Sequence, residues 1–121
     1  MEYNGRVSLI GRNEERTELS GLLDVAPVVV LVGAAGVGKS ALARAMEPNL
    51  WVDLEGASTA ADVRGRFAEA LDAPLAAWGR IAEALPSGLV VLDGAERAVD
   101  ALTEVVAWLP TASLLVTTRT R

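Results

Sequence analysis

An uninterrupted apolar run that leads directly into a glycine-rich loop constrains this chain more than any other feature. Val28–Val32 is apolar at all five positions, which is typical of a strand buried on both faces, as in a parallel sheet. Residues 33–40, Gly-Ala-Ala-Gly-Val-Gly-Lys-Ser, satisfy the pattern G-x-x-x-x-G-K-[ST] of a phosphate-binding loop. Residues 41–46 are rich in helix-forming Ala and Leu. The stretch therefore predicts a strand, a phosphate-binding loop and a helix in direct succession.

Each part of this loop has a physical role in holding phosphate. Glycines let the backbone turn so that successive N–H groups point at phosphate oxygens, and the following helix directs its positive end to the same place. Lys39 is expected to reach the outer phosphates, and the Ser40 hydroxyl to hold Mg2+. Lys39 is also the one lysine among the eleven basic residues. The predicted nucleotide-binding residues here are Gly33, Ala34, Ala35, Gly36, Val37, Gly38, Lys39, Ser40 and Ala41.

Strand-like and helix-like segments alternate along the whole chain. The predicted strands are 28–32, 50–54, 89–93 and 113–117. The predicted helices are 13–24, 38–46 and 95–109, with two more between residues 58 and 85. This alternation predicts an α/β fold, a three-layer P-loop NTPase core with a mostly parallel sheet, helices on both faces and right-handed crossovers.

Composition limits the domain count and the kinds of partner. A chain of 121 residues suits a single domain over 1–121, with a lead helix at 13–24 and a core at 28–121. A net charge of −5 without any His argues against a nucleic-acid-binding surface. The absence of Cys excludes disulfides and thiolate metal sites and is compatible with the cytosol. No apolar run approaches the roughly 18–20 residues that span a bilayer. We therefore expect a cytoplasmic domain that contacts neither nucleic acid nor membrane.

A carboxylate at the end of a buried strand is the second sign of a site. Four apolar residues, 89–92, lead into Asp93. The carboxyl ends of parallel strands share one edge of the sheet with the phosphate-binding loop, so Asp93 is expected beside Ser40, where the two could hold Mg2+. Because strands often end in Asp, this pattern alone is weak. Its position downstream of the phosphate-binding loop is what indicates a role in binding Mg2+.

Taken in order, these features resemble the nucleotide-binding domain of the STAND class of signal-transduction ATPases, relatives of the AAA+ proteins. The landmarks are Leu9–Arg12 with Glu15, the loop at 33–40, the strand at 89–93 and residues 114–119. The chain is most similar to the bacterial transcriptional-regulator branch, in which the ATPase lies beside DNA-binding or repeat domains. The resemblance implies ATP or ADP with Mg2+ as ligands and a strand order of 1-4-3-2. It also implies effector or repeat domains, and self-association, as partners.

The same resemblance implies roles for residues outside the loop. Gly11 and Arg12 resemble an N-terminal Gly-Arg motif that borders the nucleotide near its base; the alternative for Arg12 is a solvated charge beside a helix cap. Arg119 resembles a sensor arginine that responds to the γ-phosphate, and its guanidinium offers several donors to phosphate oxygens. The alternative for Arg119 is a solvated charge near the end of the sequence.

Two departures from the family pattern modify this expectation. Relatives place a second acid directly after the strand-end Asp to orient the attacking water, whereas this chain has Gly94 there. Glu96 is the nearest replacement as general base, and its alternative role is to interact with a helix dipole. The family core also has a fifth strand beside 28–32 and a helical lid, which this sequence does not contain. We therefore expect a fragment of a longer regulator, or a partner that covers this sheet edge.

Three hypotheses for function follow from these features. The first is an ATP-binding regulatory switch with slow, Mg-dependent hydrolysis that controls an effector domain outside this chain. The second is an active ATPase of the AAA+ type, and the third is a non-catalytic interaction module with a residual P-loop. The candidate catalytic residues are Lys39, Asp93, Glu96 and Arg119. The candidate metal ligands are Ser40 and Asp93.

Overall fold

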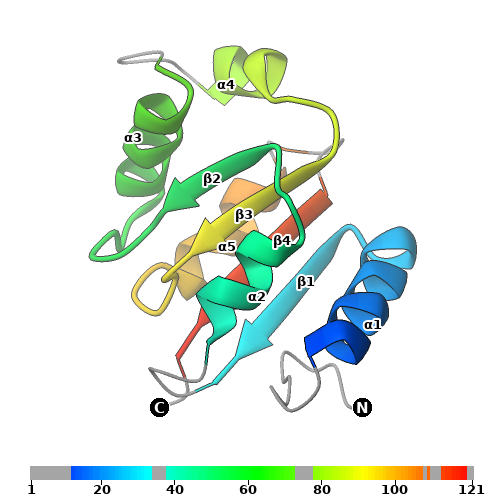
Figure 1. Ribbon diagram of the computed structural model, residues 1–121. Coiled ribbons are helices and arrows are strands. Elements are labelled where there is room, and N and C mark those ends of the chain that lie inside the picture. The colour runs from blue at the N-terminus through cyan, green and yellow to red at the C-terminus, as the bar shows by residue number, and fades with distance from the viewer. Residues whose placement is uncertain (1–11, 34–37, 73–77, 108, 110–112, 120–121) are drawn as a thin grey trace.

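Four strands form one parallel sheet in the computed structural model, which describes residues 12–33, 38–72, 78–107, 109 and 113–119 (Figure 1). All neighbouring strands pair in parallel, in the order β1-β4-β3-β2. The predicted α/β class, parallel sheet and strand order are therefore confirmed. The strands are β1 (Val28–Val32), β2 (Leu50–Asp53), β3 (Leu89–Asp93) and β4 (Ser113–Thr118).

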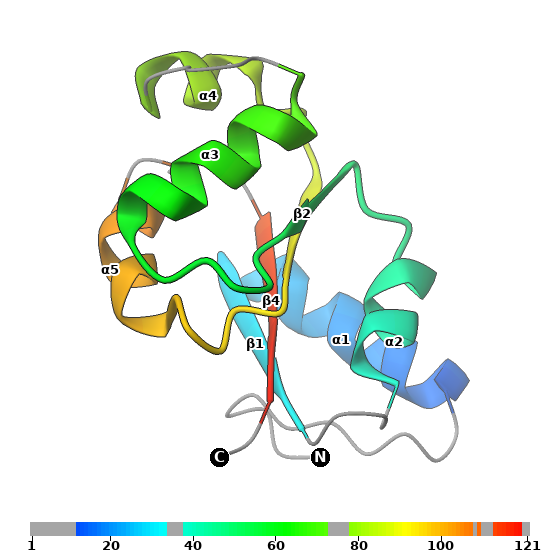
Figure 2. The same ribbon diagram turned by 90° about the vertical axis from the view of Figure 1, so that its left-hand side faces the viewer.

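Helices cover both faces of this sheet. The two views show α1 and α2 against one face and α3 and α5 against the other (Figures 1 and 2). The result is a three-layer core, with α4 in contact with α3. None of the described helices has the length and apolar character needed to cross a membrane. The helices are α1 (Arg12–Val25), α2 (Lys39–Ala45), α3 (Ala60–Ala70), α4 (Trp78–Ala84) and α5 (Val99–Ala107).

The all-apolar strands fill two separate hydrophobic cores because successive side chains point to opposite faces. On β3, Val90 and Leu92 belong to the core beneath α3, α4 and α5, whereas Val91 belongs to the core beneath α1 and α2. All three are fully buried. In the larger core, Phe67 packs edge to face against Trp78, with ring centroids 5.6 Å apart. The prediction of strands covered on both faces is confirmed.

The parallel register brings several chain segments to one edge of the sheet. Val32 pairs with Thr118, and Asp53 pairs with Asp93. Three backbone hydrogen bonds continue past the strand ends: Gly33 N–H to Thr118 O at 3.2 Å, Leu54 N–H to Asp93 O at 2.7 Å, and Ala95 N–H to Thr117 O at 2.9 Å. The first residues after β1, β2 and β3 are thus fixed to neighbouring strands at this edge, where β4 also ends.

Helix boundaries differ from prediction by one residue at each end of α1 and α2, and by more at α5. The lead helix, expected over 13–24, spans Arg12–Val25. The helix expected over 95–109 begins only at Val99. Ala95 still follows the sheet edge, since its N–H donates to the Thr117 carbonyl of β4, and a turn closed by Ala98 N–H to Ala95 O at 2.9 Å precedes the helix. Glu96 therefore lies in a turn before α5, outside the helix.

Candidate functional site

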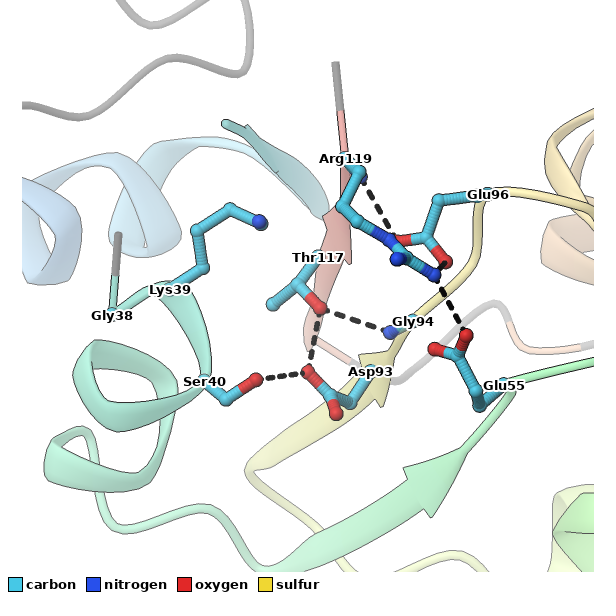
Figure 3. A pocket seen from close by; sticks show the side chains of 9 residues that line it. All are labelled: Gly38, Lys39, Ser40, Glu55, Asp93, Gly94, Glu96, Thr117 and Arg119. Atoms are coloured by element: carbon cyan, nitrogen blue, oxygen red, sulfur yellow. Dashed lines mark hydrogen bonds and ion pairs between the residues drawn. The ribbon is translucent and has the colours of Figure 1, made fainter. Parts of the chain in front are cut away.

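A pocket of about 460 Å3 lies at the carboxyl edge of the sheet (Figure 3). All five side chains proposed for catalysis or metal binding line it, although they come from three separate parts of the sequence. Because parallel strands end at this edge, the topology alone explains their convergence. The lining residues are Gly38, Lys39, Ser40, Glu55, Asp93, Gly94, Glu96, Thr117 and Arg119.

Asp93 is held at the floor of the pocket by two hydroxyl groups. Ser40 Oγ donates to Asp93 Oδ1 at 2.8 Å, and Thr117 Oγ1 donates to the same oxygen at 2.7 Å. Thr117 is 2% exposed and also accepts a hydrogen bond from the Gly94 N–H at 3.0 Å. The buried hydroxyl thus links the end of β4 to the end of β3 and fixes the direction of the carboxylate. Sequence analysis did not single out Thr117.

The first residue of the phosphate-loop motif, Gly33, is in contact with the lysine near its end. Lys39 Nζ donates to the Gly33 carbonyl at 2.6 Å, which joins the start of α2 to the end of β1. Gly38 has a φ of 85°, in the left-handed region that favours glycine. Ala41 follows in α2 and is exposed. Four predicted loop residues, Ala34, Ala35, Gly36 and Val37, lie outside the described residues, as do Gly11 and the side chain of Arg12.

Arg119 lies on the opposite side of the pocket from Lys39, between two glutamates (Figure 3). Its Nη2 donates to Glu55 Oε1 at 2.8 Å and lies 3.5 Å from Glu96 Oε2. Its backbone N–H donates to Glu96 Oε1 at 2.9 Å. Both oxygens of Glu96 therefore hold Arg119. The side chains of Glu55 and Arg119 are 60% and 46% exposed, against 22% for Glu96.

Glu55 is a pocket residue that sequence analysis missed. It comes two positions after the end of β2, just as Gly94 and Ala95 follow β3. The rule that identified Asp93, a carboxylate at the carboxyl end of a parallel strand, points on β2 to Asp53 and not to Glu55. No motif marked Glu55 either, because its importance depends on the pairing of β2 with β3.

Gly94 and Glu55 are packed closely together. Gly94 has a φ of 77°, and a Cβ atom built on it would lie 2.6 Å from Glu55 Oε2 and 3.4 Å from Glu55 N. A side chain at position 94 would thus be strained and would displace the glutamate. The backbone conformation and the nearby Glu55 therefore favour glycine at the position where the resemblance predicts an acid.

The oxygen atoms of Ser40 and Asp93 fit the ligand preference of Mg2+. Among the described residues, no group of three or more Asp, Glu, His or Cys side chains could hold a metal ion alone. Mg2+ bound to a nucleotide characteristically uses one or two protein oxygens together with phosphates and water. A hydroxyl and a carboxylate in direct contact satisfy that requirement.

Comparisons of this chain with models of protein families, with curated protein sequences and with solved structures give no match. The resemblance to the STAND class therefore stays a prediction. Function has to be inferred from the pocket and the motif that contributes to it.

Proposed function

We propose that this domain binds Mg-ATP, hydrolyses it slowly and acts as a regulatory switch. The observation that carries the proposal is the 2.8 Å contact between Ser40 Oγ and Asp93 Oδ1. The two residues are 53 positions apart; one belongs to the phosphate-loop motif and the other ends a buried strand. A hydroxyl and a carboxylate beside a phosphate cradle are the protein ligands that nucleotide-bound Mg2+ takes in P-loop proteins.

The side chains of the pocket have complementary roles in this proposal. Ser40 and Asp93 hold Mg2+, which when bound neutralises phosphate charge and orients the terminal phosphate. Lys39 moves from the Gly33 carbonyl to the outer phosphates, and Arg119 supplies further donors to the phosphate that leaves. Backbone N–H groups of the 33–41 segment cradle the phosphates, and the Gly11-Arg12 segment borders the base. The expected setting is the cytoplasm, with an effector or repeat domain as the controlled partner.

Isothermal titration calorimetry with Mg-ATP tests the binding step. Wild-type protein should bind, and Lys39→Ala should lose binding because no other lysine can replace the missing charge. Arg80→Ala is a matched control, since it also removes one positive charge but from an exposed position on α4 outside the pocket. Equal affinity of Lys39→Ala and the wild type would refute the phosphate-loop assignment.

A second candidate function is an active ATPase of the AAA+ type, which the presence of Glu55 and Glu96 in the pocket favours. The two candidates differ in turnover and not in ligand. A switch should retain bound nucleotide for minutes and release phosphate slowly, whereas an active ATPase should turn over continuously. Steady-state phosphate release, measured beside nucleotide retention on a desalting column, separates them. A non-catalytic module would show neither, and Mg-ATP would not raise its melting temperature.

A further inference from the structure

We propose that Glu55 is the carboxylate that positions the attacking water and accepts its proton during ATP hydrolysis. This inference rests on the proposed function of the pocket and adds a residue to it. Hydrolysis of a phosphoanhydride by water is assisted by a side chain that orients the nucleophile next to the terminal phosphate. Among the described residues, the carboxylates that line the pocket are Glu55, Asp93 and Glu96.

Two of these three carboxylates are already engaged. Asp93 Oδ1 accepts from two hydroxyls, and its contact with Ser40 assigns it to the metal. Glu96 uses Oε1 for the Arg119 backbone N–H and Oε2 for the Arg119 guanidinium, and its side chain is only 22% exposed. Glu96 thus positions Arg119. Glu55 uses Oε1 for Arg119, and with a 60% exposed side chain it remains open to water.

The second oxygen of Glu55 lies next to the backbone that follows Asp93. Glu55 Oε2 is 2.6 Å from the place where a Cβ atom of residue 94 would be. The Glu55 carboxylate therefore lies close to the residue that follows the proposed metal ligand Asp93, in the same pocket where the terminal phosphate is expected. The glycine at position 94 permits this approach, since a Cβ there would force the Glu55 carboxylate to move.

Glu55 is also held in place, which a group that orients water requires. Its backbone N–H donates to Asp53 Oδ1 at 2.9 Å, and the next turn closes with Ala57 N–H to Leu54 O at 2.9 Å. Gly56 has a φ of 83°, as the third residue of such a turn requires. Arg66 on α3 donates to the Asp53 carbonyl at 3.0 Å. The turn that carries Glu55 is thus attached to α3 as well as to β3.

Arg119 connects Glu55 to the phosphate. Its guanidinium has five N–H donors in a planar fork, and both ion pairs seen here use Nη2. An arginine that contacts both the γ-phosphate and Glu55 would bring the carboxylate and the phosphate to adjacent positions. The γ-phosphate, Arg119 and Glu55 would together determine where a water molecule can lie in line with the phosphoanhydride bond that breaks.

The reaction balances with these groups. The water oxygen forms a bond to the γ-phosphorus while one of its protons passes to the Glu55 carboxylate. The bond between the γ-phosphorus and the bridging oxygen breaks, and its electron pair remains on the β-phosphate of ADP. Glu55 then gives its proton to solvent, so that ADP, inorganic phosphate and one proton are the products.

The test compares Glu55→Gln with wild type in two measurements. Glu55→Gln keeps the size of the side chain and a hydrogen-bond acceptor for Arg119, but it cannot accept a proton. We expect its affinity for a non-hydrolysable Mg-ATP analogue to stay within about threefold of wild type. Single-turnover phosphate release should fall about a hundredfold or more, as loss of a general base typically causes. Glu104→Gln, an exposed change on α5, is the matched control and should behave as wild type.

A second variant separates proton transfer from simple positioning of Arg119. Glu55→Asp keeps a proton-accepting carboxylate on a shorter side chain and should release phosphate faster than Glu55→Gln, whereas a role in positioning alone would leave Glu55→Gln the faster variant. The inference is overturned if Glu55→Gln releases phosphate within twofold of the wild-type rate, or if wild type binds Mg-ATP and releases no phosphate at all. Failure of wild type to bind the analogue would instead refute the proposed function. A melting curve for each variant checks that the fold is retained.

Discussion

The replacement of Thr117 by Val measures how much the hydrogen bonds of the site contribute to the stability of the fold. The Thr117 hydroxyl is buried, donates to Asp93 at 2.7 Å and accepts from the Gly94 N–H at 3.0 Å. Valine has the same shape but can do neither. A hydrogen bond to a charged group contributes about 1.5–3 kcal/mol, and a buried N–H left without a partner costs about 1–3 kcal/mol. Since the two losses share one side chain and do not simply add, we expect Thr117→Val to destabilise the domain by about 2–4 kcal/mol.

Equilibrium unfolding in urea, followed by circular dichroism, measures this loss. With a slope of about 2 kcal/mol per molar, the middle of the range for small domains, the midpoint should fall by about 1–2 M. Thr118→Val is the matched control, because Thr118 is also buried but lies outside this hydrogen-bond network. Thr117→Ser should lose only about 1 kcal/mol, since it keeps the hydroxyl and removes one methyl group. Equal midpoints for Thr117→Val and Thr118→Val would refute the network as a source of stability.

Two further predictions concern backbone conformation and pH. Gly94→Ala should destabilise the domain by about 1–3 kcal/mol, because a φ of 77° strains alanine and its Cβ would meet Glu55; a thermal melt measures this. Backbone N–H groups of Ser58 and Thr59 hold the pKa of Asp62 below its ordinary value of 3.8, so its contribution to stability should be complete above that pH. That contribution should be lost as the pH falls through the lower pKa of the folded state, as urea midpoints measured across this range would show.

Each of these two predictions has a control. Gly65→Ala in α3 meets nothing within 4 Å and should be neutral or stabilising, which separates the strain at Gly94 from a general effect of the mutation. Asp62→Asn should remove the acid dependence that Asp62 adds, because the amide does not titrate. An unchanged slope of stability against pH in Asp62→Asn would contradict the assignment of that dependence to Asp62.

Local sequence was enough to predict the strands of the sheet but not the residues at which the helices begin and end. Val28–Val32 and Leu89–Asp93 are correct because an all-apolar run has few alternatives to a strand covered on both faces. The predicted start of α5 was wrong because a turn over 96–98 separates the helix from Ala95, which is hydrogen-bonded to Thr117 on another strand. Apolar periodicity carries no information about such a bond. Helix boundaries are therefore set by contacts that a single segment cannot reveal.

The site was predictable to the extent that each residue belongs to a recognisable pattern. Lys39, Ser40 and Asp93 follow the phosphate loop and the strand-end rule, and the structure brings them to one pocket. Thr117 and Glu55 belong to no motif, and their importance arises only when β4 and β2 are placed on either side of β3. Thr117 holds Asp93, and Glu55 holds Arg119. Motif searches therefore find residues such as Lys39, Ser40 and Asp93 more readily than the residues that hold a site in place.

The order of the strands has a consequence for how the chain folds as it is synthesised. β1, which leads into the phosphate loop, pairs with β4 at the far end of the described sequence. While a ribosome is still translating the middle of the domain, β1 is an apolar segment without its neighbour, and the long separation makes this pairing slow. Chaperones that bind the chain during this interval would protect β1 from aggregation. Because Thr117 and Arg119 arrive with β4, the proposed nucleotide site can be complete only after that final pairing.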